Sequence, residues 1–486
     1  MSDLRGSLLV AGTTSDAGKS VVTTGICRWL HRQGVRVAPF KAQNMSNNSM
    51  VTADGAEIGR AQWVQAVAAG AEPEAAMNPV LLKPGSDLRS HVVLMGEPAG
   101  QLDASSFARA RPRLAEAAYA AYDDLASRFD VVVCEGAGSP AEINLREHDF
   151  VNMGLAQHGR IPTVVVGDID RGGVFAAMYG TLKLLSAADQ QLVRGFVVNK
   201  FRGDGSLLAP GVEMLQEATE RPVLGVVPWL PDLRLDSEDT IATLPSTDNS
   251  TGRPLRVAVV RFPRISNFTD LDALAVEPGV EVRYVDAPDA VPDADLVVLP
   301  GTRSTLDDLA WLRARGLDGP IVARHRGAQP VLGICGGFQM LGRHVADPEG
   351  VETGSPSAAV GLGLLPVRTR FGPDKVLARP AGSALGHDVR GYEIHHGRVD
   401  VHGGEPFLDG CRDGTTWGTL WHGAFENDGF RRAFLAQVAV DAHRTDWQVA
   451  QDTAFAAARE RQIDLLADAV EEHLDTDALR EMIERG

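Results

Sequence analysis

A glycine-rich loop lies between an apolar segment and a helical segment near the start of the chain. Residues 7–11 are mostly apolar and predict a buried strand, and residues 12–20 read Gly-Thr-Thr-Ser-Asp-Ala-Gly-Lys-Ser. Residues 21–32 then predict a helix that stops before Gly34. Strand, loop and helix in this order are typical of a phosphate-binding loop in an α/β fold. The first part of the chain is therefore expected to form a mostly parallel sheet flanked by helices.

The residues of this loop predict a nucleotide site. Backbone N–H groups from Gly12, Thr13 and Gly18 would surround phosphate oxygens, Lys19 would add a positive charge, and the Ser20 hydroxyl could bind Mg²⁺. Five residues separate the two glycines, one more than the standard spacing. The longer form resembles the dethiobiotin synthetase group, which transfers phosphate to a carboxyl-type oxygen. The alternative is a glycine-rich turn without nucleotide, against which the flanking strand and helix both count.

Acidic residues provide candidates for a metal site. Residues 129–134 predict a strand that leads to Glu135, at the sheet edge where ligands of open α/β sheets bind. Glu135 resembles the Mg²⁺-binding acid of the dethiobiotin synthetase group, and Asp54 is a second metal candidate. For each of them, the alternative is a loop carboxylate that caps a turn.

Two further predicted strands end in polar residues. Residues 163–167 lead to Asp168 and Asp170, which are candidates for substrate contacts. Residues 195–198 lead to Asn199, whose amide could read the adenine edge of a nucleotide. Turn capping is again the alternative for the two acids.

A cysteine marks a second site in the C-terminal half. Residues 331–334 predict an apolar strand, and the chain continues as Cys335-Gly336-Gly337 into a helix. A Gly-x-Cys-x-Gly turn between strand and helix is a nucleophile elbow, which lifts the side chain above the sheet. Backbone N–H groups such as that of Gly336 can then form an oxyanion hole. A buried structural cysteine is the alternative.

Residues 333–339 resemble the signature of class I (triad) glutamine amidotransferases, whose cysteine attacks the side-chain amide of glutamine and releases ammonia. The resemblance implies that His422, at the end of the apolar segment 416–421, is the base, and that Gly301 contributes to the oxyanion hole. The usual pattern has a glutamate two residues after the histidine. That place is Ala424 here and the nearest acid is Glu426, so the sequence leaves the third triad residue open.

Composition excludes several other classes of protein. The net charge of −17 argues against nucleic-acid binding, which depends on Lys and Arg. No apolar run is long enough for a membrane span and no signal peptide begins the sequence. The four cysteines, one expected as a free thiol, fit a reducing cytoplasm. A homo-oligomer is possible.

The chain divides at a polar stretch that contains Pro and Gly. We predict a nucleotide-binding synthetase domain over residues 1–242, a linker over 243–254 and an α/β glutamine amidotransferase domain over 255–447. Residues 448–486 are charged and Ala-rich, and predict a helical segment that covers a domain or contacts a subunit.

An ammonia source beside a phosphoryl-transfer site suggests one reaction. A carboxylate is a poor electrophile, but transfer of the ATP γ-phosphate would make an acyl phosphate that ammonia can attack. The pair of sites therefore predicts ATP-dependent amidation of a carboxylate, with L-glutamine as nitrogen donor.

The substrate is suggested by resemblance alone. Residues 40–48, 57–62, 77–84 and 391–397 resemble the cobyric acid synthase family of vitamin B12 biosynthesis. The resemblance implies amidation of the b, d, e and g carboxylates of a corrinoid, adenosylcobyrinic acid a,c-diamide. Polar side chains after Phe40 would suit a corrin rim, although an ordinary polar loop is the alternative. They are Lys41, Gln43, Asn44, Asn47 and Asn48.

Two other functions stay open. The sister cobyrinic acid a,c-diamide synthase shares both domains, but the segment from Lys41 to Asn48 speaks against it. A P-loop switch ATPase with a decayed amidotransferase domain is the second. An intact Cys335 and His422 speak against this reading.

Overall fold

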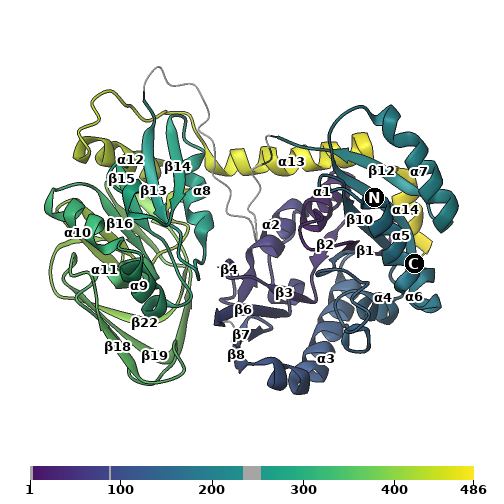
Figure 1. Ribbon diagram of the computed structural model, residues 1–486, viewed down its shortest axis with the longest axis horizontal. Helices are drawn as coiled ribbons and strands as arrows, with labels where there is room; N and C mark the ends of the chain where they lie inside the picture. The colour runs from purple at the N-terminus through teal and green to yellow at the C-terminus, as the bar shows by residue number, and fades with distance from the viewer. Residues whose placement is uncertain (1–3, 87–88, 232, 234–252, 486) are drawn as a thin grey trace.

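Six parallel strands form the centre of the N-terminal lobe. The computed structural model describes residues 4–86, 89–231, 233 and 253–485, which form two lobes with a long helix running between them (Figure 1). The strand order is β12-β11-β10-β1-β9-β2. The bounds are β1 (Gly6–Gly12), β2 (Val37–Phe40), β9 (Val131–Glu135), β10 (Thr163–Asp168), β11 (Val193–Phe201) and β12 (Val223–Pro228).

Alternating side chains of these strands enter two separate cores. Val131 and Val133 of β9 pack with the first helix, whereas Val132 and Cys134 pack in the core on the other face. Because both faces are covered, the strands are apolar throughout, as expected for a parallel sheet. The helices are α1 (Lys19–Arg32), α2 (Arg60–Ala68), α3 (Ala104–Arg128), α4 (Met153–Gly159), α5 (Val174–Leu184), α6 (Ala187–Leu192) and α7 (Gly205–Thr219).

The strand order places the glycine-rich loop at a topological switch point. Strand β1 lies between β10 and β9, and pairs in parallel with both. The loop that follows β1 therefore opens at the carboxyl ends of the strands, where α/β sheets bind ligands.

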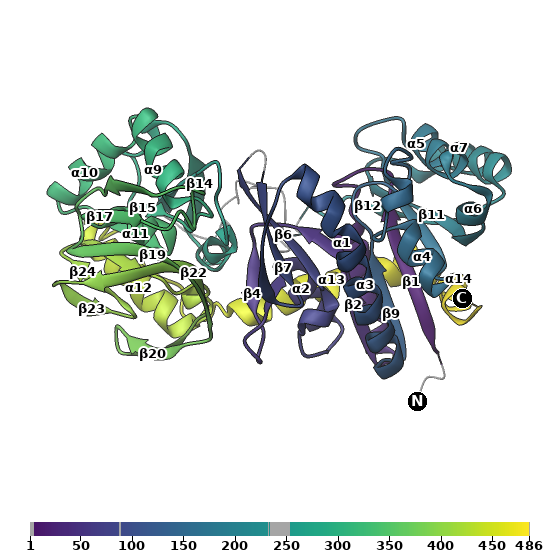
Figure 2. The ribbon, with the colours of Figure 1, turned by 90° about the horizontal axis from the view of Figure 1, so that it is seen from below.

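A smaller sheet projects from this lobe toward the other one. It has the order β3-β6-β7-β8 and lies between the two main sheets in Figure 2. A short hairpin, β4 (Ser49–Val51) and β5 (Glu57–Gly59), precedes α2. The sheet strands are β3 (Gln43–Met45), β6 (Val80–Ser86), β7 (Arg89–Leu94) and β8 (Glu97–Leu102).

The C-terminal lobe contains a seven-stranded sheet of order β14-β13-β15-β16-β25-β24-β23. The pairs from β14 to β25 are parallel, and β24 and β23 add an antiparallel edge. The strands predicted over residues 255–260 and 331–334 coincide with two of these. The bounds are β13 (Leu255–Val260), β14 (Val280–Val285), β15 (Leu296–Leu299), β16 (Val331–Ile334), β23 (Glu405–Phe407), β24 (Gly410–Asp413) and β25 (Thr416–Thr419).

Helices and a second sheet complete this lobe. The helices are α8 (Asp272–Ala275), α9 (Thr305–Ala314), α10 (Asp318–Arg326), α11 (Gly336–Leu341) and α12 (Asp428–Asp441). The second sheet is formed by β18 (Ser357–Val360), β17 (His344–Asp347), β19 (Val367–Ala378) and β22 (Glu393–Val401). A separate hairpin pairs β20 (Ala381–Ala384) with β21 (His387–Arg390).

The C-terminal helices return to the N-terminal lobe. Helices α13 (Phe455–His473) and α14 (Thr476–Arg485) bury apolar side chains in the core beneath α1. Arg28 of α1 is bonded to Asp464 at 2.8 Å and to Glu460 at 2.7 Å. The predicted helical segment 448–486 thus covers the first lobe, with its first helix beginning at Phe455. The predicted linker lies outside the described residues apart from Arg253 and Pro254.

No described helix combines the length and the apolar character needed to cross a membrane.

Candidate active sites

Cys335 occupies a strained turn between β16 and α11. Its backbone has φ 49° and ψ −111°, a conformation that non-glycine residues rarely adopt. The glycines beside it allow close approach: a Cβ at Gly337 would lie 1.9 Å from the carbonyl oxygen of Leu299. The geometry is that of the predicted nucleophile elbow.

His422 lies just beyond β25 and faces the cysteine. Its Nδ1 lies 2.7 Å from Oδ2 of Asp270, and its ring is close enough to Cys335 to interact electrostatically with the sulfur. Burial opposes the charged imidazole, but Asp270 and Cys335 outweigh burial and raise the pKa of His422 to about 10. A protonated imidazole beside a sulfur stabilises negative charge on that sulfur, which favours nucleophilic attack.

Asp270 completes an arrangement of three side chains and was missed by the sequence analysis. It lies in the turn η3 (Phe268–Leu271), and its Oδ1 accepts a hydrogen bond from the N–H of Gly423 at 2.8 Å. Both carboxylate oxygens are thus directed at the segment that carries His422. Glu426, the acid nearest to His422 in sequence, pairs instead with Arg60 and Arg459, each at 3.0 Å.

Backbone from two loops converges beside Cys335. A Cβ at Gly301 would lie 2.9 Å from Cε1 of His422, and a Cβ at Gly336 would lie 3.1 Å from the N of Thr302. Gly336 begins α11, so its N–H has no acceptor within the helix. The two glycines predicted for the oxyanion hole therefore lie next to the nucleophile.

A narrow cavity of about 40 Å³ adjoins Cys335 and is lined by both lobes. Lys83 comes from the N-terminal lobe, and Arg303 and Glu352 come from the C-terminal lobe. Glu352 accepts hydrogen bonds from the N–H groups of Thr305 (2.6 Å) and Leu306 (2.9 Å). Burial raises the pKa of Glu352 to about 7. Basic and acidic side chains therefore both lie beside the thiol.

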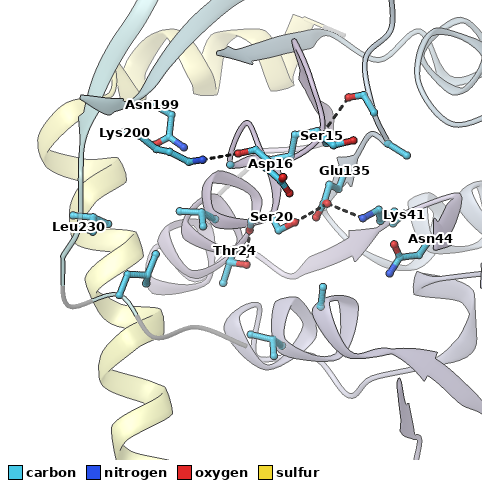
Figure 3. A pocket seen from close by; sticks show the side chains of 18 of the residues that line it. Ser15, Asp16, Ser20, Thr24, Lys41, Asn44, Glu135, Asn199, Lys200 and Leu230 are labelled. Carbon is cyan, nitrogen blue, oxygen red and sulfur yellow. Dashed lines mark hydrogen bonds and ion pairs between the residues drawn. The ribbon is translucent and has the colours of Figure 1, made fainter. Parts of the chain in front are cut away.

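A second cavity, of about 570 Å³, opens over the glycine-rich loop (Figure 3). Gly18 has φ 98°, in the region that favours glycine. Nζ of Lys19 donates to the carbonyl of Thr14 at 2.9 Å and to that of Gly138 at 3.2 Å. The lysine is therefore held over the loop where a phosphate would lie.

Glu135 joins the loop to the polar segment after β2. Its Oε1 accepts hydrogen bonds from Ser20 Oγ at 2.8 Å and Lys41 Nζ at 2.9 Å (Figure 3), and its Oε2 accepts one from Gln65 Nε2 at 2.5 Å. Burial opposes ionisation, but Lys41 and the hydrogen bonds from Gln65 and Ser20 lower the pKa of Glu135. The site therefore holds a charged carboxylate and a hydroxyl side by side, which are oxygen ligands that Mg²⁺ accepts.

The other predicted nucleotide-site residues brace the loop. Asn199 Nδ2 donates to the carbonyl of Ala17 at 3.0 Å, and Asn199 also lines the large cavity. The N–H of Thr13 donates to the carbonyl of Val166 at 2.9 Å, and a Cβ at Gly12 would lie 3.0 Å from the side chain of Lys19.

Three predicted acids do not line this cavity. Asp54 lies in the exposed turn between β4 and β5, where it is bonded to Thr52, so the structure does not bring it to Ser20 and Glu135. Asp168 pairs with Lys200 at 2.8 Å, and Asp170 pairs with Arg202 at 3.3 Å.

The polar segment after β2 divides between the cavity and the other lobe. Lys41 and Asn44 line the large cavity, and Asn44 donates to Gln62 at 3.0 Å. The buried side-chain oxygens of Gln43 and Asn47 have no hydrogen-bond partner among the described residues. Unpaired buried oxygens are costly, which points to a ligand that donates hydrogen bonds. Asn48 contacts Phe268 of the C-terminal lobe instead.

Comparison with known proteins gives matches to both halves of the chain. Residues 8–241 match the CobQ/CobB/MinD/ParA nucleotide binding domain, and residues 256–430 match the CobB/CobQ-like glutamine amidotransferase domain.

Similar full-length proteins share a single name. Cobyric acid synthases of Mycobacterium marinum, Mycolicibacterium vanbaalenii and Mycobacterium tuberculosis are each 60% identical to this chain, over 99% of it and 97% of their own length. Among solved structures, a glutamine amidotransferase matches 38% of this chain and 98% of its own, at 17% identity with a TM-score of 0.30. A TM-score that low carries no argument.

Proposed function

The chain belongs to the cobyric acid synthase family, and from this premise we propose that it amidates the b, d, e and g carboxylates of adenosylcobyrinic acid a,c-diamide to give cobyric acid. It is an ATP-using, glutamine-dependent amide ligase of cobalamin biosynthesis. The observation that carries the proposal is the presence, in one chain, of the Cys335 elbow beside a hydrogen-bonded His422–Asp270 pair and of a phosphate-binding loop backed by Glu135.

In the amidotransferase half, Cys335 is the proposed nucleophile and His422 the base. The sulfur attacks the amide carbon of glutamine, and the imidazolium gives its proton to the departing nitrogen, so that ammonia and a thioester result. The N–H groups of Gly301 and Gly336 stabilise the negative oxygen of the tetrahedral intermediate. Asp270 keeps the imidazole in position and favours its charged form.

In the synthetase half, the loop that contains Gly12, Thr13 and Gly18 surrounds the ATP phosphates, and Lys19 neutralises charge. Ser20 and Glu135 are the proposed Mg²⁺ ligands, where the ion would supply positive charge between the phosphates. The substrate carboxylate takes the γ-phosphate and becomes an acyl phosphate. Ammonia then displaces phosphate and leaves an amide.

The corrinoid is proposed to bind beside this cavity, against the polar segment after β2. Lys41 lies next to Glu135, where a cation can pair with a substrate carboxylate. The unpaired oxygens of Gln43 and Asn47 suit the N–H groups of corrin carboxamides. Asn44, Asp168 and Asp170 remain candidates for corrinoid contacts and Asn199 for the adenine.

Two coarser features belong to the same proposal. Residues 1–242 act as the synthetase unit, 255–447 as the amidotransferase and 448–486 as a helical cover. The described cysteines are all free thiols, which fits a reducing cytoplasm.

Product analysis tests this function and its alternatives. The protein would be incubated with ATP, Mg²⁺, glutamine and either cobyrinic acid or its a,c-diamide, and the corrinoid masses read. We expect fourfold amidation of the a,c-diamide. If only cobyrinic acid were amidated, the protein would be a cobyrinic acid a,c-diamide synthase. If neither corrinoid were amidated, the result would favour a switch ATPase. The shared name of the relatives favours the first outcome.

A further inference from the structure

The segment that carries Asp270 is bonded to the N-terminal lobe. The side-chain Oδ1 of Asn267 accepts a hydrogen bond from the N–H of Ser49 at 2.9 Å. In return, the N–H of Phe268 donates to Oδ1 of Asn48 at 3.3 Å. Asn267 has φ 48° and ψ 38°, so these bonds hold a left-handed turn immediately before η3. Asp270 lies three residues after Asn267.

The segment that follows His422 is bonded to the same part of the N-terminal lobe. Glu426 ends the turn η5 (Ala424–Glu426), and its Oε1 lies 3.0 Å from Nη2 of Arg60. Arg60 is 2% exposed and the Glu426 side chain 25%, so this ion pair is partly shielded from water. The N–H of Arg60 also donates to the carbonyl of Asn48 at 3.0 Å. The contacts to the segments that carry Asp270 and His422 therefore come from one stretch of the N-terminal lobe, residues 48–60, which we call the positioning unit.

A buried ion pair fixes this unit against the C-terminal lobe. Glu57, with an exposed fraction of 0%, accepts from Lys83 at 2.6 Å and pairs across the interface with Lys375. Burial opposes ionisation of Glu57, but the two lysines outweigh it and lower its pKa. Breaking a buried pair leaves an uncompensated charge, so separation of the lobes here is costly.

We infer that residues 48–60 of the synthetase half position the triad of the amidotransferase half. The inference rests on the proposed function only for the use made of the ammonia. Asn48, Arg60 and Glu426 are positioning residues, because they join residues 48–60 to the segments that carry Asp270 and His422 and do not line the cavity beside Cys335. Asn267 makes the same connection through Ser49 and also lines that cavity. Small displacements of a catalytic group cost much activity, and a shift of about 1 Å can cost about 10²-fold.

The positioning unit also reaches the nucleotide site. Helix α2 begins at Arg60 and carries Gln65, whose Nε2 donates to Glu135 at 2.5 Å. One short helix thus connects the residue that holds Glu426 with the carboxylate beside Ser20. Helix α2 therefore contacts both the segment that follows His422 and the proposed synthetase site, where the ammonia is used.

Asn267 offers a sharp test because two substitutions separate its roles. Asn267→Gly keeps the left-handed turn accessible and removes the acceptor for Ser49, whereas Asn267→Asp retains an acceptor oxygen. We expect Asn267→Gly to lower kcat for glutamine hydrolysis about tenfold or more, with KM little changed, and Asn267→Asp to keep most of the activity. The alkaline limit of the pH profile should move down in Asn267→Gly, because Asp270 then raises the pKa of His422 less.

Asn48→Ala removes the reciprocal bond and should act in the same direction. In the double variant Asn48→Ala with Asn267→Gly, the activation free energy for glutamine hydrolysis should rise by less than the sum of the two single effects. The reason is that both substitutions weaken the same contact between the two segments. Arg32→Ala is the matched control. It breaks ion pairs with Asp464 (2.9 Å) and Asp468 (2.6 Å) on α13, away from the triad segments, and should leave glutamine hydrolysis unchanged.

Amidation driven by ammonium salts shows in each variant that the synthetase half is folded. Unchanged hydrolysis in Asn267→Gly, an equal loss in Asn267→Asp, or a comparable loss in Arg32→Ala would overturn the inference. A wild-type protein that hydrolyses glutamine but amidates no corrinoid would refute the proposed function and leave the positioning inference standing.

Discussion

Asp270 Oδ2 lies 2.7 Å from Nδ1 of His422, although 152 residues separate the two in the chain. This contact provides the partner that the sequence motif lacks, because Ala424 occupies the position where class I amidotransferases usually have a glutamate. Glu426, the acid nearest to His422 in sequence, pairs with Arg60 and Arg459 instead.

Asp270→Asn is predicted to impair glutamine use strongly. The amide cannot favour the imidazolium as a carboxylate does, so we expect a loss of ~10²-fold or more in kcat for glutamine hydrolysis. His422→Ala should cost roughly 10²–10⁴-fold. Glu426→Gln should cost much less, because Glu426 does not contact the imidazole. A loss in Glu426→Gln that equals the loss in Asp270→Asn would contradict this assignment.

The raised pKa of His422 predicts a pH-dependent contribution to stability. Its ordinary value is 6.5 and its value in the fold is about 10. A pKa raised by folding stabilises the folded state fully below about pH 6.5, and this contribution is lost as the pH rises through about 10. The wild type should therefore have a larger free energy of unfolding than Asp270→Asn at about pH 6.5, and this difference should decrease as the pH rises toward about 10. Urea titrations at several pH values measure it, and a constant difference would refute the prediction.

Substitutions in the glycine-rich loop should abolish amidation with either nitrogen source. Lys19→Met removes the charge held over the loop, and Ser20→Ala removes the hydroxyl bonded to Glu135, so no acyl phosphate can form. Corrinoid mass after incubation with ammonium or glutamine is the measurement. Glutamate release by the amidotransferase half shows that each variant is folded. Normal ammonia-driven turnover in Lys19→Met would show that this loop does not hold ATP.

Partially amidated corrinoids are predicted to leave the protein during turnover. The structure has a single phosphate loop and a single cysteine elbow among its described residues, yet the proposed substrate has four target carboxylates around a wide ring. A single site reaches them only if the corrinoid is released and rebinds in a new orientation. Mass spectrometry of the free corrinoid pool under excess substrate should show intermediates. Substrate and final product alone would indicate a ligand that turns while enclosed.

Local patterns predicted the turn that carries Cys335 and the phosphate loop, whereas His422 was assigned as the base from the family resemblance. Cys335 lies between β16 and α11, and Lys19 begins α1 after the loop that follows β1. The flanking strands and helices have clear apolar patterns. His422 follows a third strand. In such strand–turn–helix segments, residues that are neighbours in the sequence determine the backbone geometry, so the geometry could be predicted from the sequence.

Residues brought together by tertiary packing were not predictable in the same way. Asp270 is one acid among 64 in the chain and lies in a turn without a motif, so only the approach of η3 to His422 reveals it. The same holds for Arg60 and Gln65, which an amphipathic pattern treats as ordinary helix residues. The charged pattern of α13 predicts a helix with one packing face but does not say that this face returns to α1.

Cys335→Ala, assayed with two nitrogen sources, tests the two-site account most directly. The variant lacks the sulfur that attacks glutamine, whereas the loop, Glu135 and the corrinoid segment are unchanged. Corrinoid amidation with glutamine should disappear, and amidation with ammonium salts should continue at the wild-type rate. An equal loss with both nitrogen sources would contradict the account, because the thiol would then serve the synthetase reaction itself.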